Sequence, residues 1–138
     1  MAGRGGLPAA TVRRVVGAVL AGERAAADMS VTFVGRDRMR AMNRAWKGHD
    51  RPTDVLSFQL GGPRPAGDVY VCPWVAAREA RARGVPAREE LVRLVVHGTL
   101  HALGWDHPEG DGRERAPMWR RQERYVRRLV PSAARRAS

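Results

Sequence analysis

The sequence predicts an α+β fold in a single domain, with a small mixed β-sheet of about three to four strands and about five helices around it. Three observations support this prediction. The chain has 138 residues, of which 43% are hydrophobic, so its length suits one moderate core. Short apolar or alternating segments lie between longer segments with helical spacing. No linker or internal repeat divides the chain, so residues 1–138 are expected to form one domain, with mobile ends at 1–7 and 131–138.

The first half of the chain predicts two helices and two strands. Residues 8–21 have apolar positions at helical spacing, and residues 30–34 predict a short strand. Residues 36–46 predict a second helix, with Met39, Met42 and Trp46 on one stripe, and Trp46 is expected to pack in the core. The polar residues 47–53, which include Gly48 and Pro52, predict a loop before a strand at 54–58.

The second half predicts one strand and three helices. A connection rich in glycine and proline at 60–67 leads to a strand at 68–72, which ends in the single cysteine, Cys72. One cysteine excludes an internal disulfide, which fits a reducing cytosol, and a buried apolar role is expected for it. Helices are predicted at 73–83, before Gly84, and at 86–103. A final helix is predicted at 113–130, with Pro117 in its first turn.

The helix predicted at 86–103 is expected to be central and buried. Leu91, Leu94 and Val95 lie on one stripe, while Val92 and Val96 cover much of another side. Apolar side chains on most sides of a helix indicate that it packs against neighbours all round.

Three of the four histidines lie close together in this region, in the segment HGTLHALGWDH at residues 97–107. His97 and His101 are four residues apart, so a helix presents them on one face. Gly104 can end that helix in the left-handed conformation, which allows the chain to turn back with His107. Three converging imidazoles with one open position are typical of a catalytic zinc site. We therefore predict one Zn²⁺ per chain, held by His97, His101 and His107.

The chain is strongly basic, because 25 Lys and Arg residues outnumber 14 Asp and Glu residues and give a formal charge of +11. A small domain of this charge is expected to bind a polyanion, with nucleic acid as the first candidate. An arginine-rich composition with no partner is the alternative. No apolar run approaches the length of a transmembrane span, so no membrane partner is expected.

The histidine segment resembles the signature HGxLHLxGxDH of the YbeY family of bacterial rRNA maturation factors. Two further segments agree: GHDRPTDVLSF at 48–58 resembles the family stretch GKDxPTDVLSF, and GDVYVC at 67–72 resembles its GDxxI strand. The run MWRRQE at 118–123 is similar to the pattern of its last helix. The match covers roughly residues 30–128 in consistent order.

The resemblance implies a cytoplasmic, zinc-dependent, single-strand-specific endoribonuclease that acts in 16S rRNA 3′-end maturation and ribosome quality control. RNA, as the 16S rRNA precursor and the ribosome, is the implied partner, with ribosomal proteins or GTPases of ribosome assembly as further partners. In this interpretation Lys47 stabilises charge on the phosphate as a catalytic residue, and Arg51 binds the RNA backbone. Trp105 or Trp46 is a candidate for stacking on an unpaired base.

The chain departs from the family pattern at three places. Lys47 stands where the family usually has arginine, and lysine keeps the charge without the bidentate fork. His49 stands where the family has another basic residue. The family generally begins with a strand before its first helix, so a sheet with one strand fewer is expected here.

Two other functions stay open at this point. Zinc proteases with the pattern HExxHxxGxxH share the histidine spacing, but their general base follows the first histidine, and Gly98 stands there in this chain. A non-catalytic ribosome assembly factor with structural zinc would need a fourth ligand, for which Asp106, His49 and Cys72 are candidates. Asp106 is better placed to anchor a histidine ring or shape the turn.

Overall fold

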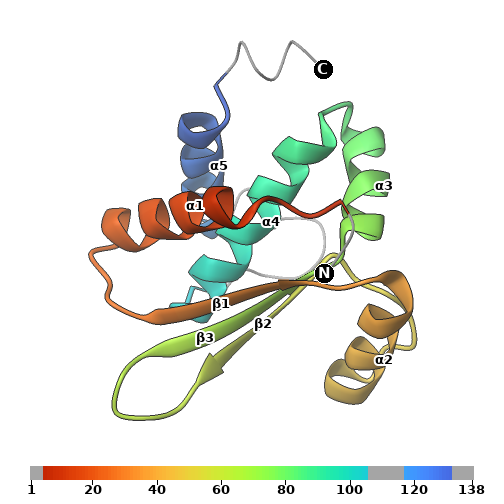
Figure 1. Ribbon diagram of the computed structural model, residues 1–138, viewed down its shortest axis with the longest axis horizontal. Helices are drawn as coiled ribbons and strands as arrows, with labels where there is room; N and C mark the ends of the chain where they lie inside the picture. The colour runs from red at the N-terminus through yellow and green to blue at the C-terminus, as the bar shows by residue number, and fades with distance from the viewer. Residues whose placement is uncertain (1–4, 106–116, 132–138) are drawn as a thin grey trace.

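The computed structural model describes residues 5–105 and 117–131, which fold into five helices and three strands (Figure 1). This is the predicted α+β architecture. In chain order the elements are α1 (Ala9–Gly22), β1 (Asp28–Phe33), α2 (Arg36–Lys47), β2 (Val55–Leu60), β3 (Ala66–Val71), α3 (Pro73–Arg83), α4 (Ala87–Ala102) and α5 (Pro117–Leu129).

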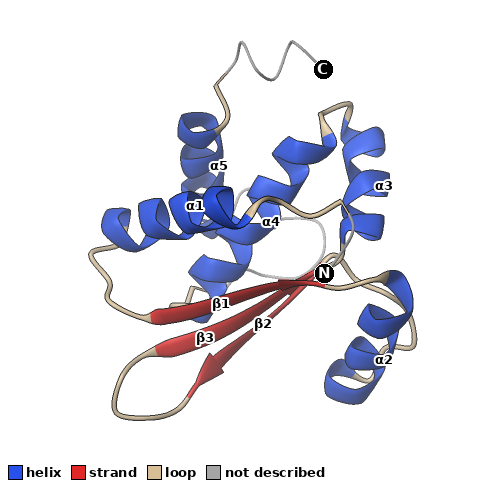
Figure 2. Cartoon of the chain, viewed as in Figure 1, coloured by secondary structure: helices blue, strands red, loops and turns tan. Residues whose placement is uncertain are grey.

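The three strands form one mixed sheet in the order β1-β3-β2. β1 runs parallel to β3, with Val31 opposite Val69, and β2 runs antiparallel to β3, with Ser57 opposite Val69. Most of the helices lie on one side of the sheet, as Figure 2 shows. Since side chains alternate along a strand, Val69 and Val71 of β3 are fully buried, whereas Tyr70 between them is only half-buried.

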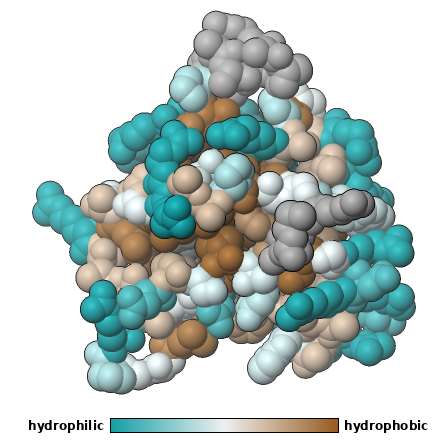
Figure 3. All heavy atoms as spheres, in the orientation of Figure 1, coloured by the Kyte–Doolittle hydropathy of each residue, from teal (hydrophilic) through white to brown (hydrophobic). Residues whose placement is uncertain are grey.

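The main core surrounds α4, which contacts β2, β3, α1, α3 and α5. Its apolar side chains are buried on several sides, so the prediction of a central, buried helix is confirmed. In the space-filling view, apolar side chains gather toward the middle of the visible face and hydrophilic ones lie around it (Figure 3). A second, smaller core of Val34, Met39, Leu56 and Cys72 packs α2 against the sheet.

Gly98 allows α4 to lie very close to the sheet. A Cβ atom at this position would be 2.4 Å from Cγ1 of Val69 and 3.3 Å from Cγ2 of Val55. No side chain fits there without moving β3 or α4. The glycine that follows His97 is therefore explained by packing against the sheet.

The ends of several elements differ from prediction by about two residues. β1 begins at Asp28 and β3 at Ala66, because these two residues pair with each other and extend the ladder beyond the apolar residues. α4 ends at Ala102 and Gly104 has φ +105°, so the predicted helix break is confirmed. Among the described residues no strand precedes α1, and no helix is both long and apolar enough to cross a membrane. Residues 113–116 of the predicted last helix lie outside the described part of the chain.

The prediction that Trp46 packs in the core is wrong, since this side chain is 67% exposed. α2 buries Met39 and Asn43, but Trp46 lies in the last turn, beyond the edge of the small core. Its ring meets only the edge of Phe58, with the centroids 5.5 Å apart. Cys72 is buried as predicted and directly precedes α3.

Candidate functional site

His97 and His101 lie side by side on α4, as their spacing predicts. Their ring centroids are 5.6 Å apart and the planes meet at 68°. Both side chains are half-buried, and they are placed by a helix that is packed on several sides. The third predicted ligand, His107, lies outside the described residues, as does Asp106. The structure therefore brings together two of the three predicted ligands.

A glutamine from α5 determines the orientation of His97. Nδ1 of His97 is 2.8 Å from Oε1 of Gln122, and Nε2 of Gln122 donates a hydrogen bond to Oε2 of Glu123 at 3.0 Å. Because a carboxylate only accepts, the amide of Gln122 must turn its oxygen toward the histidine, which then donates from Nδ1. The neutral ring of His97 consequently carries its lone pair on Nε2, the nitrogen that would bind a metal.

A buried ion-pair network holds Gln122 and Glu123 in place. Arg93 of α4 donates to both oxygens of Glu123 at 2.8 and 2.9 Å, and to Glu89 and Glu90 at 2.9 Å each. Burial alone would raise the pKa of Glu123, but hydrogen bonds from Arg93 and Gln122 hold it below its usual value. Burial likewise opposes the charge of Arg93, and the carboxylates around it raise its pKa. The network therefore ties α5 to α4 directly behind His97.

His97 also lines a small hollow together with Trp119, Gln122 and a group of carboxylates. About 40 Å³ of this hollow can hold the centre of a water molecule, which is room for a few waters. The carboxylates Asp54, Glu79 and Glu90 come from the start of β2, from α3 and from α4. Sequence reasoning missed them because no single segment contains them.

Glu79 carries a proton in this hollow at neutral pH. Burial and the charges of Asp54 and Glu90 raise its pKa to about 8, and its side chain hydrogen-bonds to both. Two carboxyl groups can share a hydrogen bond only when one of them is protonated. The backbone N–H of Val55 donates to Oδ1 of Asp54 at 2.7 Å, which holds this carboxylate at the lining of the hollow. Glu79 is therefore the neutral member of the group.

The structure places Lys47 and Arg51 outside the hollow. Lys47 is the last residue of α2 and is exposed, and Arg51 is exposed in the loop before β2. The amide of Asn43 holds this loop by donating a hydrogen bond to the carbonyl oxygen of Arg51 at 2.8 Å. Of the residues between α2 and β2, Asp54 lines the hollow. The catalytic role of Lys47 and the RNA contact of Arg51 stay predictions.

Trp105, the other candidate for base stacking, is held by several contacts. It packs against the main core, its Nε1 donates to Glu23 at 2.9 Å, and the Arg121 guanidinium lies 5.1 Å from its ring centroid. These contacts indicate a structural role for Trp105 at the end of α4.

The described residues provide no fourth protein ligand beside the two histidines. Within the described ranges, no three His, Cys, Asp or Glu side chains are arranged to hold a metal. Cys72 is buried in the smaller core with Met39 and Leu56, and His49 is exposed in the loop after α2. The site on α4 therefore consists of His97 and His101 as far as the structure describes it, and His97 also lines the small hollow beside Gln122.

The fold and the paired histidines define a class of protein: a small α+β domain whose buried central helix presents two candidate metal ligands on one face. A sequence model of the family described as Endoribonuclease YbeY matches residues 8–130. This chain belongs to the endoribonuclease YbeY family, which confirms the resemblance carried by the three motifs.

Relatives named Endoribonuclease YbeY are similar over most of the chain. The Thermotoga maritima relative is 37% identical over 98 residues, which cover 71% of this chain and 65% of the relative. The relative from Azorhizobium caulinodans is 40% identical over 102 residues, covering 70% of this chain and 64% of that protein. The matched segments cover between 50% and 65% of the length of these curated relatives. A solution structure of a Thermotoga maritima protein is 29% identical, has a TM-score of 0.65, and covers 90% of this chain and 85% of that one.

Proposed function

We propose that this chain is a zinc-dependent endoribonuclease that cuts single-stranded RNA. The observation that carries the proposal is the pair His97 and His101 on one face of the buried helix α4, with Gln122 bound to Nδ1 of His97 so that Nε2 is the nitrogen for a metal. Membership of the endoribonuclease YbeY family supports the activity, and the formal charge of +11 supports a phosphate-rich substrate. We extend the proposal to 16S rRNA 3′-end maturation and ribosome quality control in the cytoplasm.

The donor set fits zinc, because two neutral imidazoles come from one rigid helix and the sequence supplies a third histidine after the helix break. His97, His101 and His107 would hold the ion, which when bound supplies Lewis-acid chemistry at a phosphoryl oxygen or a water. The chain's own groups do the rest. Gln122 orients His97, Glu79 keeps a proton on its carboxyl group in the hollow, and Lys47 and Arg51 provide positive charge on the neighbouring loop.

Gly98 argues against the protease alternative. A protease of the HExxH type needs a glutamate at this position as its general base. A Cβ atom here would already lie 2.4 Å from Val69, so the position faces the sheet with no room for a longer side chain. The assembly-factor alternative predicts zinc binding without RNA cleavage, and the experiment below distinguishes it.

The test measures metal content and cleavage in the same preparations. We expect about one zinc per chain by elemental analysis, and most of it lost in His97→Ala, His101→Ala and His107→Ala. The exposed loop histidine provides the matched control, because His49→Ala should keep its zinc. Single-stranded RNA should be cut, double-stranded RNA much less, and a chelator should stop the reaction. Unchanged metal content in all three variants would refute the site, and cleavage of casein with RNA untouched would favour a protease.

Gln122→Leu tests the orientation of His97. Loss of such a partner typically weakens metal binding by about 10–100-fold, so the dissociation constant for zinc should rise by this factor. Gln59→Leu, in the exposed end of β2, is the control and should bind zinc like the unmodified chain. Equal affinities for both variants in a competition titration with a chelating dye would remove Gln122 from the site.

A further inference from the structure

α5 presents a row of arginines to solvent. Arg124, Arg127 and Arg128 are exposed, and none of them forms an ion pair within the part of the chain that the structure describes. The one carboxylate of this helix, Glu123, faces inward to Arg93. The outer face of α5 is therefore positive, with no acidic side chain of its own to compensate.

Two surface hollows follow this row. One of about 330 Å³ is lined by Trp119, Arg120, Glu123, Arg124 and Arg127. The other, of about 150 Å³, lies where α5 meets the end of α1 and is lined by Gly22, Arg121, Arg124, Tyr125 and Arg128. Arg124 belongs to both. Recesses that each contain three guanidinium groups are suited to phosphate groups, because guanidinium pairs with phosphate through two parallel hydrogen bonds.

The first hollow shares one residue with the hollow of His97, since Trp119 lines both. From Trp119 the helix rises about 1.5 Å per residue, which places Arg127 roughly 12 Å further along α5. A strand lying along the row would therefore have one end beside Trp119.

We propose that the α5 row, represented by Arg124 and Arg127, binds the sugar–phosphate backbone of the RNA strand next to the segment that lies at the histidine pair. This inference rests on the proposed endoribonuclease function and adds where the strand lies. Trp119, half-buried at the junction, offers an aromatic ring for an unpaired base. The Arg83 guanidinium, 5.1 Å from the centroid of that ring, adds positive charge at the same point.

RNA fits this surface better than an anionic membrane does. A helix that lies on a membrane combines basic residues with an exposed apolar face. The large hydrophobic side chains that are exposed among the described residues, Trp46, Leu60 and Trp74, all lie on other elements. The apolar residues of α5, such as Met118 and Val126, are buried against the core.

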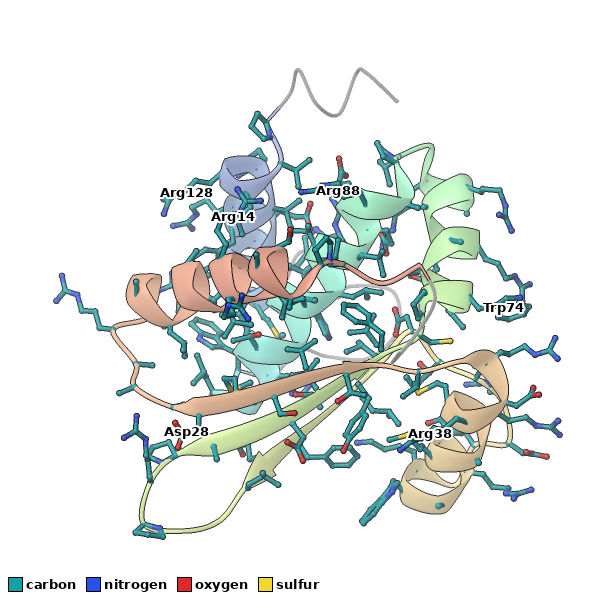
Figure 4. All side chains as sticks on the ribbon, in the orientation of Figure 1. Arg14, Asp28, Arg38, Trp74, Arg88 and Arg128 are labelled. Carbon is teal, nitrogen blue, oxygen red and sulfur yellow. The ribbon has the colours of Figure 1, made fainter. Side chains whose placement is uncertain are left out.

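The experiment compares two double variants that each remove two exposed positive charges. Arg124→Gln with Arg127→Gln changes the α5 row, and Arg38→Gln with Arg81→Gln changes α2 and α3. Arg38 lies well away from Arg128 of the row in Figure 4. Binding of fluorescent single-stranded RNA is measured with a chelator present to prevent cleavage. Oligonucleotides of about 4 and about 12 nucleotides are used over a salt series, since these lengths span the usual site sizes of single-strand binders.

We expect the α5 variant to reduce the slope of log K against log salt by about 1.4 for the longer RNA, since each lost contact to a single strand contributes about 0.7. Binding of the short RNA, and the slope for the control variant, should stay unchanged. Arg124→Lys with Arg127→Lys should restore most of the slope, because the charge is kept. Unchanged melting temperatures would show that the variants are folded.

Equal slope changes in the two double variants would overturn the inference in favour of diffuse charge. The inference would also be overturned if the α5 variant lost its binding to vesicles containing anionic lipid but kept its binding to RNA, because the row would then bind a membrane. If the unmodified chain binds neither RNA, the proposed function fails with it. If the unmodified chain binds and cuts RNA but the α5 variant behaves like the control, only the placement of the strand fails.

Discussion

The chain should lose stability as pH rises, because Glu79 is held uncharged in the folded state. Glu79→Gln should remove most of this loss. In the native chain the pKa of Glu79 is raised from 4.5 to about 8 by burial and by Asp54 and Glu90. A group whose native pKa is raised stabilises the fold below its unfolded pKa, and this contribution is lost as pH rises through the native pKa. The unmodified chain should therefore lose stability between about pH 4.5 and pH 8, whereas the amide stays neutral and can still donate to its neighbours.

The size of the effect follows from the shift. At about 1.4 kcal/mol per unit, the difference between 4.5 and about 8 sets an upper limit of about 5 kcal/mol. Because the side chain is only half-buried, solvent screens part of this, and we expect about 2 kcal/mol. For a domain of this size, about 2 kcal/mol corresponds to roughly 7 °C in melting temperature.

The melting temperatures of the variant and of the unmodified chain are measured from pH 5 to pH 9 with a chelator present. Their difference is then plotted against pH. The variant should match the unmodified chain near pH 5 and exceed it by about 7 °C near pH 9. Asp37→Asn, an exposed carboxylate in the first turn of α2, controls for the change in net charge and should give a flat difference curve. A flat curve for Glu79→Gln as well, or a difference that grows toward low pH, would refute the raised pKa of Glu79.

Two further predictions concern Lys47 and Gly98. Lys47→Ala should lower the RNA cleavage rate by about 10²–10³-fold with zinc content and fold intact, and Lys47→Arg should keep or raise it; equal rates for all three residues would remove Lys47 from the mechanism. Gly98→Ala should destabilise the fold by about 1–2 kcal/mol, since crowding against Val69 outweighs the gain in helix propensity. Its control is Gly17→Ala in α1, where a Cβ meets nothing within 4 Å and should stabilise by about 1 kcal/mol in denaturant unfolding.

The sequence predicted those parts of the fold that depend on local periodicity. α4 was expected to be central because apolar residues occur on most of its sides, and His97 and His101 were paired by helical spacing. The end of α4 before Gly104 followed from the conformational freedom of glycine. These features need only short segments of chain, which is why pattern reasoning found them.

The features that the sequence did not reveal depend on contacts between distant segments. Asp54 and Glu79 lie on different parts of the chain, and only the packing of α3 beside the residues that precede β2 brings them close enough for Asp54 to raise the pKa of Glu79. The pairing of Gln122 with His97 likewise joins α5 to α4. Trp46 was misjudged for the same reason, because its place on the apolar stripe of α2 does not say where the small core ends.

The bond between Gln122 and His97 makes the docking of α5 part of ligand binding on α4. A ligand that binds only one arrangement of a protein stabilises that arrangement, by an amount that grows with the logarithm of the ligand concentration above the dissociation constant. Local opening of α5 would release His97 from its fixed orientation, so occupancy of the histidine pair and closure of α5 are thermodynamically linked. Amide hydrogen exchange along α5 would then slow as the histidine pair is filled. Hydrogen exchange in α5 would therefore report whether a ligand is bound to the histidines of α4.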